Sequence, residues 1–157
     1  MAEESASEDC VAVDLDQYVI APGLTANGFP TVHRVRDGKI TYGTDGKRCC
    51  LSPSAYPIRR DEFELCKEWI TQFCKPRKTP SRWGSYGLKH VVERFYSGPG
   101  QRGYVSNGAF IAAAIACGYE PLNINGPNAE FGFWIHLDGF KGSEGYLEGR
   151  RPTKGFV

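Results

Sequence analysis

Cationic side chains and two tyrosines gather in residues 75–105, and their chemistry suits contact with nucleic acid. The stretch holds seven Lys and Arg residues against one acid, Glu93, which gives a net charge of +6. Lys and Arg bind phosphate oxygens whatever the base sequence, and aromatic rings stack on bases. The candidate nucleic-acid or partner-binding residues are Lys75, Arg77, Lys78, Arg82, Tyr86, Lys89, Arg94, Arg102 and Tyr104.

Charges in the rest of the chain are also segregated. Residues 1–16 contain six acids and no base, and residues 106–149 have a net charge of −4. Such segregation bears on the partners of a protein rather than on its fold. It favours nucleic acid, a nucleoprotein complex or a host protein as the partner. A solvated basic face without a ligand is the alternative.

A glycine-rich segment from Gly98 to Gly103 matches the GxGxxG pattern of nucleotide-binding loops. In those loops a strand precedes the glycines and a helix opens within them. Here a helix is expected before the glycines, and Pro99 removes a backbone N–H that a phosphate would need. The pattern therefore predicts an ordinary loop. A weaker phosphate site, made by Arg102 and the start of the following helix, is left open.

The residues of catalytic sites are present but scattered. His33, His90 and His136 lie in three separate segments, and no nucleophile is visibly paired with any of them. The acidic residues form no DxD or ExxE cluster in a loop suited to catalysis. We therefore predict a non-enzymatic protein with no catalytic residues and no cofactor. A metal- or nucleotide-dependent enzyme is the alternative.

Six cysteines occur without a CxxC pair or zinc-ribbon spacing, so we expect reduced thiols and no metal site. A zinc site built from Cys49, Cys50, His33 and a distant thiol is the alternative. The acidic N-terminus lacks the basic start and apolar segment of a secretory signal. The longest apolar run, nine residues from Ala109 to Cys117, is too short to span a membrane. These features predict a cytoplasmic protein with no membrane partner and leave the oligomeric state open.

Three helices should carry the candidate residues. Apolar residues at helical spacing predict the first helix from about Asp61 to a stop at Pro76, and the second from Ser85, its cap, to Tyr96. Lys89 is expected away from the buried stripe of the second helix. The third helix should start at Ser106 or Asn107 and end at Gly118. Its alanine-rich surface and the long loop before it argue against a base-reading helix-turn-helix.

Short strands should flank the helices. Residues 31–51 predict an antiparallel meander with turns at Asp37-Gly38 and Asp45-Gly46, and residues 130–138 read as a strand that Asp138-Gly139 could turn into a second hairpin. The class is therefore α+β, with an N-terminal β meander, a central three-helix unit and a C-terminal β hairpin. We expect a disordered acidic tail (1–10), one domain (11–149, in parts 11–56, 57–120 and 121–149) and a basic tail (150–157).

Two segments carry a resemblance. SYGLKHVVERF, from Ser85, and GYVSNGAFIAAAIACGYEP, from Gly103, resemble an SYxLKHxxE…YxSNGxFIxAA pattern in small uncharacterised proteins of bacteriophages, prophages and plasmids. The resemblance covers roughly residues 60–130 and is strongest over 85–119. That family has no settled activity, so the resemblance implies a mobile-element context and supplies no catalytic residues.

These observations predict an accessory protein of a phage or mobile element that acts by binding. Its basic helical unit would contact nucleic acid or a nucleoprotein complex. Small phage proteins without an enzymatic signature often bind host defence machinery, as anti-CRISPR proteins do. A stoichiometric protein inhibitor of host defence, acting through protein–protein contacts, is therefore the alternative.

Overall fold

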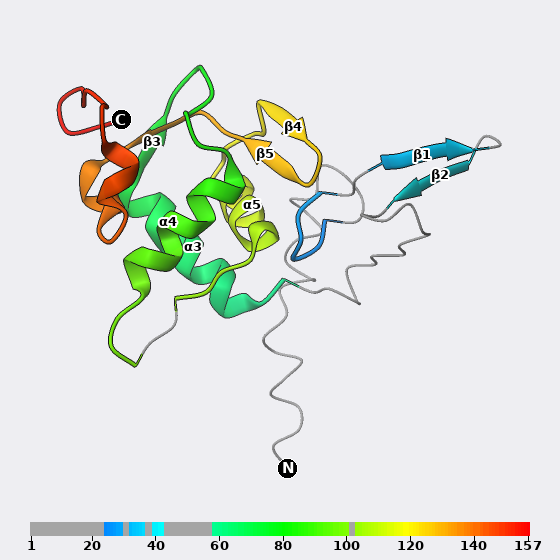
Figure 1. Cartoon of the computed structure of the whole chain (residues 1–157), viewed down its shortest axis with the longest axis horizontal. Helices are drawn as coiled ribbons and strands as arrows, with labels where there is room; N and C mark the ends of the chain where they lie inside the picture. Colours follow the sequence, from blue (N-terminus) through cyan, green and yellow to red (C-terminus); the bar gives the residue numbers. More distant parts are fainter. Residues whose placement is uncertain (1–23, 30–31, 37–38, 43–57, 101–102) are drawn as a thin grey trace, which may run out of the picture.

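The computed structural model describes residues 24–29, 32–36, 39–42, 58–100 and 103–157, and it shows the predicted α+β class (Figure 1). Three α-helices are present in this part of the chain, α3 (Arg60–Phe73), α4 (Ser85–Tyr96) and α5 (Asn107–Ala116). The strands form antiparallel pairs: β1 (Val32–Arg36) with β2 (Lys39–Tyr42), β3 (Cys74–Pro76) with β6 (Phe133–Ile135), and β4 (Asn123–Asn125) with β5 (Asn128–Glu130). Two 3₁₀ helices follow, η1 (Leu137–Phe140) and η2 (Glu144–Leu147).

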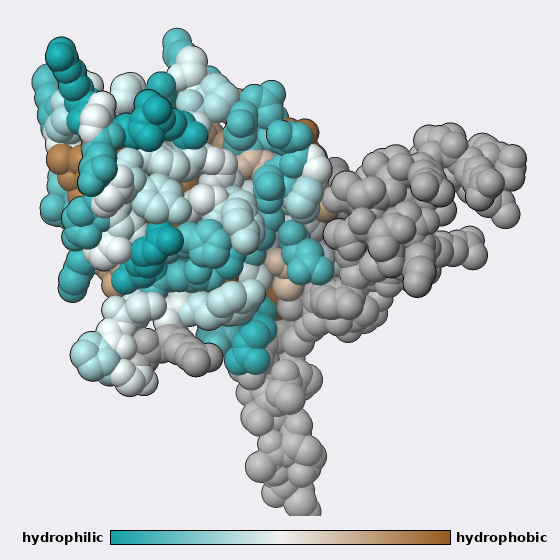
Figure 2. Space-filling view, viewed as in Figure 1, coloured by the Kyte–Doolittle hydropathy of each residue, from teal (hydrophilic) through white to brown (hydrophobic). Residues whose placement is uncertain are grey.

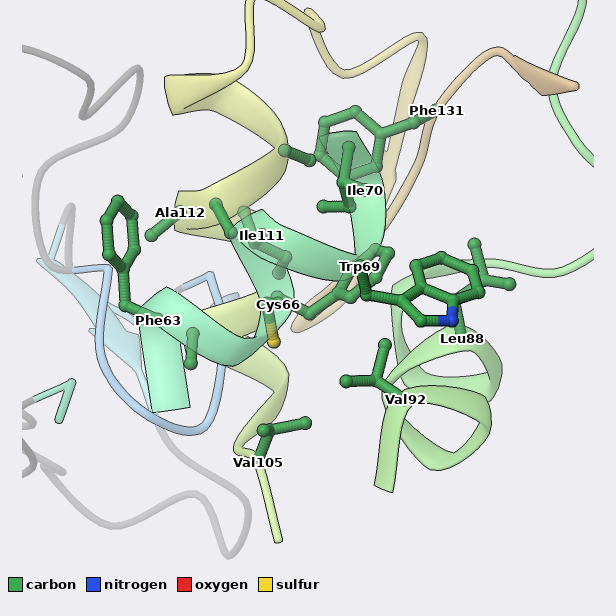
Figure 3. Close-up of a cluster of buried hydrophobic side chains, with 14 of the residues drawn as sticks. Phe63, Cys66, Trp69, Ile70, Leu88, Val92, Val105, Ile111, Ala112 and Phe131 are labelled. Atoms are coloured by element: carbon green, nitrogen blue, oxygen red, sulfur yellow. The ribbon is translucent and has the colours of Figure 1, made fainter. Parts of the chain in front are cut away.

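Helix α5 lies at the centre of the core. All its residues from Asn107 to Ala114 are buried, because small side chains allow α3 and α4 to approach it closely. Apolar side chains from α3, including Trp69, face those of α4 and α5 across this interface (Figure 3). The Trp69 indole Nε1 donates to the Gly139 carbonyl at 3.0 Å, so the largest core side chain leaves no unpaired donor.

The predicted helices are confirmed, with two corrections at their ends. Helix α3 ends at Phe73 rather than at Pro76, because Cys74–Pro76 form β3 and pair with β6. Helix α4 has the predicted bounds, but Gly84 occupies its N-cap position. The Ser85 hydroxyl instead accepts a hydrogen bond from the Ala129 N–H at 3.0 Å, which joins α4 to β5. The Ser106 side chain caps α5 as expected, and Gly118, with φ of +93°, ends it.

Strand β3 follows α3 directly and, through its pairing with β6, brings the connector between α3 and α4 onto the C-terminal part of the chain. Residues Cys74, Lys75 and Pro76 stand opposite Ile135, Trp134 and Phe133. The N–H of Arg77 extends the pairing by donating to Gly132. On the other side of β6, Ile135 and Val157 exchange backbone hydrogen bonds, so the basic tail is held against the core rather than loose.

The C-terminal hairpin forms, but at a different place from the predicted turn. Residues 123–130 fold into β4 and β5 around Gly126, whose φ is +61°, whereas Asp138-Gly139 lies in η1. The N-terminal hairpin of β1 and β2 is present. The expected acidic tail, the turns at Asp37-Gly38 and Asp45-Gly46, and the third strand of the meander lie outside the described residues. Within the described part of the chain, no helix combines the length and apolarity required to traverse a membrane.

Replacing Gly108 with alanine should destabilise the fold by about 2–3 kcal/mol. Alanine normally stabilises a helix relative to glycine. At Gly108, however, a Cβ would collide with the carbonyl of Thr25, whose segment packs on the start of α5. Urea unfolding checks the sign of the effect. Gly98→Ala is the control, since a Cβ there meets nothing within 4 Å. Equal stability of the Gly108 variant and the wild type would contradict the packing of residues 24–29 on α5.

Candidate functional site

Two cations of the connector lie over aromatic rings. Lys75 and Trp134 are paired across β3 and β6, so their side chains share the outer face of this short sheet. The Lys75 ammonium is 4.3 Å from the centre of the Phe156 ring, and the Arg77 guanidinium carbon is 4.5 Å from that of Trp134. We call Lys75, Arg77, Trp134 and Phe156 the cationic–aromatic face.

The positive charges of the cationic–aromatic face, and of the connector residues beside it, are not paired with acids in the described part of the chain. Among the described residues, no carboxylate forms a salt bridge with Lys75, Arg77, Lys78 or Arg82. Lys78 and Arg82 are exposed and continue the charge along the connector toward α4. Arg77 is oriented by a 2.8 Å hydrogen bond from its Nε to the Thr79 hydroxyl. The arrangement can therefore bind an anion without first breaking an ion pair.

Lys89 does not belong to this exposed set, contrary to the expectation that it lies away from the buried stripe. Only 6% of the residue is exposed, and its Nζ donates to Glu93 Oε1 at 2.7 Å. The other carboxylate oxygen of Glu93 lies 2.7 Å from His90 Nδ1. Burial raises the pKa of the Glu93 carboxyl, but the hydrogen bonds from Lys89 and His90 outweigh it and lower that pKa below 4.5. Glu93 therefore neutralises the charge of Lys89.

A pocket of about 350 Å³ opens beside Lys89. The rings of Tyr86 and Tyr104 are centred 5.6 and 4.8 Å from the Lys89 ammonium, and these tyrosines are 54% and 60% exposed. Three chain segments besides α4 complete the walls: residues 26–27, the segment from Tyr104 to Asn107, and the hairpin turn between β4 and β5. We name this the tyrosine pocket, lined by Ala26, Asn27, Tyr86, Lys89, Tyr104, Asn107, Pro127 and Asn128.

The remaining predicted residues lie elsewhere. The Arg94 guanidinium carbon is 5.1 Å from the centre of the Tyr146 ring, and Arg94 Nη1 donates to the Ser143 hydroxyl at 3.4 Å. Arg102 is outside the described residues. The candidates therefore divide into the cationic–aromatic face with its connector, the tyrosine pocket, and a separate Arg94 contact. Sequence reasoning found Tyr86, Lys89 and Tyr104 but missed the three asparagines, which carry no charge and come from distant segments.

The described residues contain no group of three or more His, Cys, Asp or Glu side chains placed to hold a metal ion. The proposed zinc ligands Cys49 and Cys50, and the side chain of His33, fall outside the described part of the chain. Burial raises the pKa of the Cys66 and Cys74 thiols well above their ordinary value, so both thiols are protonated at neutral pH.

None of the protein-family models matches the sequence of this chain, no curated protein matches it significantly, and no solved structure matches its fold. A proposal for its function therefore has to be argued from the geometry of the cationic–aromatic face and the tyrosine pocket.

Glu93→Gln should lower the free energy of unfolding by about 2 kcal/mol at pH 7, because Lys89 then loses its charged partner while buried. The pKa of Glu93 is lowered in the folded protein. Its contribution is therefore present above about pH 4.5 and is lost as pH falls through the folded-state pKa. Urea unfolding at pH 7 and pH 3 should show the gap between variant and wild type narrowing at the lower pH. The control is Glu64→Gln on the exposed side of α3; a gap that is the same at both pH values would refute the ion pair.

Proposed function

We propose that this protein is a non-enzymatic accessory protein of a phage or mobile element that binds nucleic acid, alone or in a nucleoprotein complex. The observation that carries the proposal is that Lys75 lies over the Phe156 ring and Arg77 lies over the Trp134 ring. A guanidinium stacked on an indole presents a flat, charged surface at fixed position. Such surfaces suit single strands of nucleic acid, because cations bind the phosphates and aromatic rings stack on the bases.

Single strands fit this geometry better than the grooves of a duplex. Major-groove reading requires a helix or ribbon that projects from the protein. Helix α5, which would be the reading helix of a helix-turn-helix, is buried from Asn107 to Ala114 and offers its side chains to the core. Contacts would come instead from the connector and the short β3–β6 sheet. We therefore expect binding with little preference for base sequence.

The polar character of the surface supports a charged partner. In the coloured part of Figure 2, residues of hydrophilic or intermediate hydropathy cover most of the surface in view, and hydrophobic ones form only small separate spots. A stable protein partner usually covers a larger apolar centre. Phosphates meet the exposed Lys75, Lys78 and Arg82 directly, which makes nucleic acid the better match.

A protein partner is the second candidate, and β4 favours it. Leu122 and Ile124 are exposed large apolar residues on and beside this strand. Within the described residues β4 pairs only with β5. A stoichiometric inhibitor of a host defence protein could dock there. Leu122→Glu/Ile124→Glu would then abolish inhibition and leave oligonucleotide binding unchanged.

The double variant Lys75→Glu/Lys78→Glu should weaken binding of a single-stranded oligonucleotide by tenfold or more. It should also reduce the slope of log affinity against log salt by about 1.4, since each lost phosphate contact removes about 0.7. Fluorescence anisotropy from 50 to 300 mM salt measures both quantities for oligonucleotides of several sequences. The control, Lys67→Glu/Lys141→Glu, makes the same change in charge on exposed residues elsewhere. Equal losses in the two variants, or affinity independent of salt, would refute the proposal.

A further inference from the structure

We propose that the tyrosine pocket holds one unstacked nucleobase. When the base belongs to a bound strand, the pocket proposal extends the proposed function and rests on it, because the cationic–aromatic face would hold that strand. A free nucleoside offers the same ring chemistry. The pocket, at about 350 Å³, is at the lower end of the roughly 300–1,000 Å³ range of small-molecule sites. It suits one nucleoside better than an extended peptide.

The walls of the pocket are aromatic and held in place. The rings of Tyr86 and His90 meet edge to face, with a centre-to-centre distance of 4.8 Å and an angle of 88° between them. His90 is in turn held by Glu93 at 2.7 Å. Tyr104 is adjacent to the Lys89 ammonium, which the same carboxylate holds. Glu93 therefore holds the two side chains that contact the tyrosine rings, and a ring that is already in contact loses less entropy on stacking.

The charge of the pocket favours a neutral ring over a phosphate. Lys89 is the only basic residue among the described residues that line the pocket, and Glu93 pairs with its ammonium. The other polar groups facing the pocket come from tyrosines and asparagines. An anion would have to compete with Glu93 for Lys89, whereas a base requires only stacking and hydrogen bonds.

Asn107 adds an unused acceptor. The residue is 6% exposed, and its Nδ2 group lies within hydrogen-bond distance of the Asn27 carbonyl at 3.2 Å, the Pro127 carbonyl at 3.2 Å and Asn128 Oδ1 at 3.0 Å. These three acceptors fix the orientation of the carboxamide. Among the described residues its Oδ1 atom has no hydrogen-bond partner, and because that atom is buried, a ligand reaches it only when the pocket wall moves slightly.

A buried acceptor without a partner is costly, and a ligand N–H would satisfy it. Nucleobases present such groups as amino or imino N–H on their edges, and asparagine carboxamides pair with these edges in known complexes. The combination of two tyrosine rings, a neutralised lysine and a lone carboxamide acceptor therefore points to a base rather than to an acidic ligand.

The first experiment compares two labelled 12-nucleotide single strands, one of deoxyadenosine and one with abasic sugars throughout. Tyr86→Ala/Tyr104→Ala should weaken binding of the deoxyadenosine strand by about 10- to 100-fold, as the loss of stacking on one base predicts. The affinity of this variant for the abasic strand should equal that of the wild type. Tyr86→Phe/Tyr104→Phe keeps the rings and should retain most of the affinity, and circular dichroism verifies that all variants fold.

Where the wild type binds the deoxyadenosine strand, equal losses on both strands, or no loss on either, would overturn the pocket proposal. A second titration, of adenosine and of inorganic phosphate by calorimetry, separates it from the proposed function. Adenosine binding that the alanine pair abolishes supports the pocket even if the wild type binds no strand, which would refute only the proposed function. Strand binding that depends on Lys75 and Lys78 but not on the tyrosines would refute only the pocket, as would binding of phosphate in place of adenosine.

Discussion

The burial of α5 is the constraint on which the rest of the structure depends. A helix of alanines and small residues has little side-chain volume, so neighbouring elements must approach its backbone closely to exclude water. Helix α3 packs along it, and the N–H of Gly108 donates to the Ala26 carbonyl at 2.9 Å. This approach places residues 24–29 beside the start of α5. The pocket wall that residues 26–27 form is therefore a consequence of core packing.

Glu93 connects that packing to the candidate site. Its carboxylate contacts the side chains of Lys89 and His90 on its own helix. It also accepts a hydrogen bond from the Val105 N–H, 3.4 Å away, in the segment that leads into α5. A single half-buried acid thus connects the end of the long loop to the two side chains, Lys89 and His90, that contact the exposed tyrosines. The cationic–aromatic face depends on a different element, the β3–β6 pairing, which sets Lys75 beside Trp134. The two sites are joined through the connector that carries Lys78 and Arg82.

Much of the helical framework could be predicted because its signals are local. The spacing of Leu88, Val91 and Val92 and the Ser106 cap each act within one or two turns of helix. The partners of short strands are not local signals. Three-residue segments such as Cys74–Pro76 have no distinctive pattern, and only the folded chain shows that β3 pairs with β6 some 60 residues away. Ser85 illustrates the same limit. The sequence predicts that its side chain caps α4, but the hydroxyl instead accepts a hydrogen bond from the N–H of Ala129, which is distant in the sequence.

The sequence by itself determined the α+β class, the three helices and the concentration of positive charge in residues 75–105, because composition and periodicity act along the chain. Only the tertiary structure decided which of those charges are free. Lys89 and Lys75 look alike in sequence, yet one is buried against Glu93 and the other lies over Phe156 at the surface. The role of a charged side chain is set by its burial and by its neighbours in space, and both follow from how the helices pack around α5.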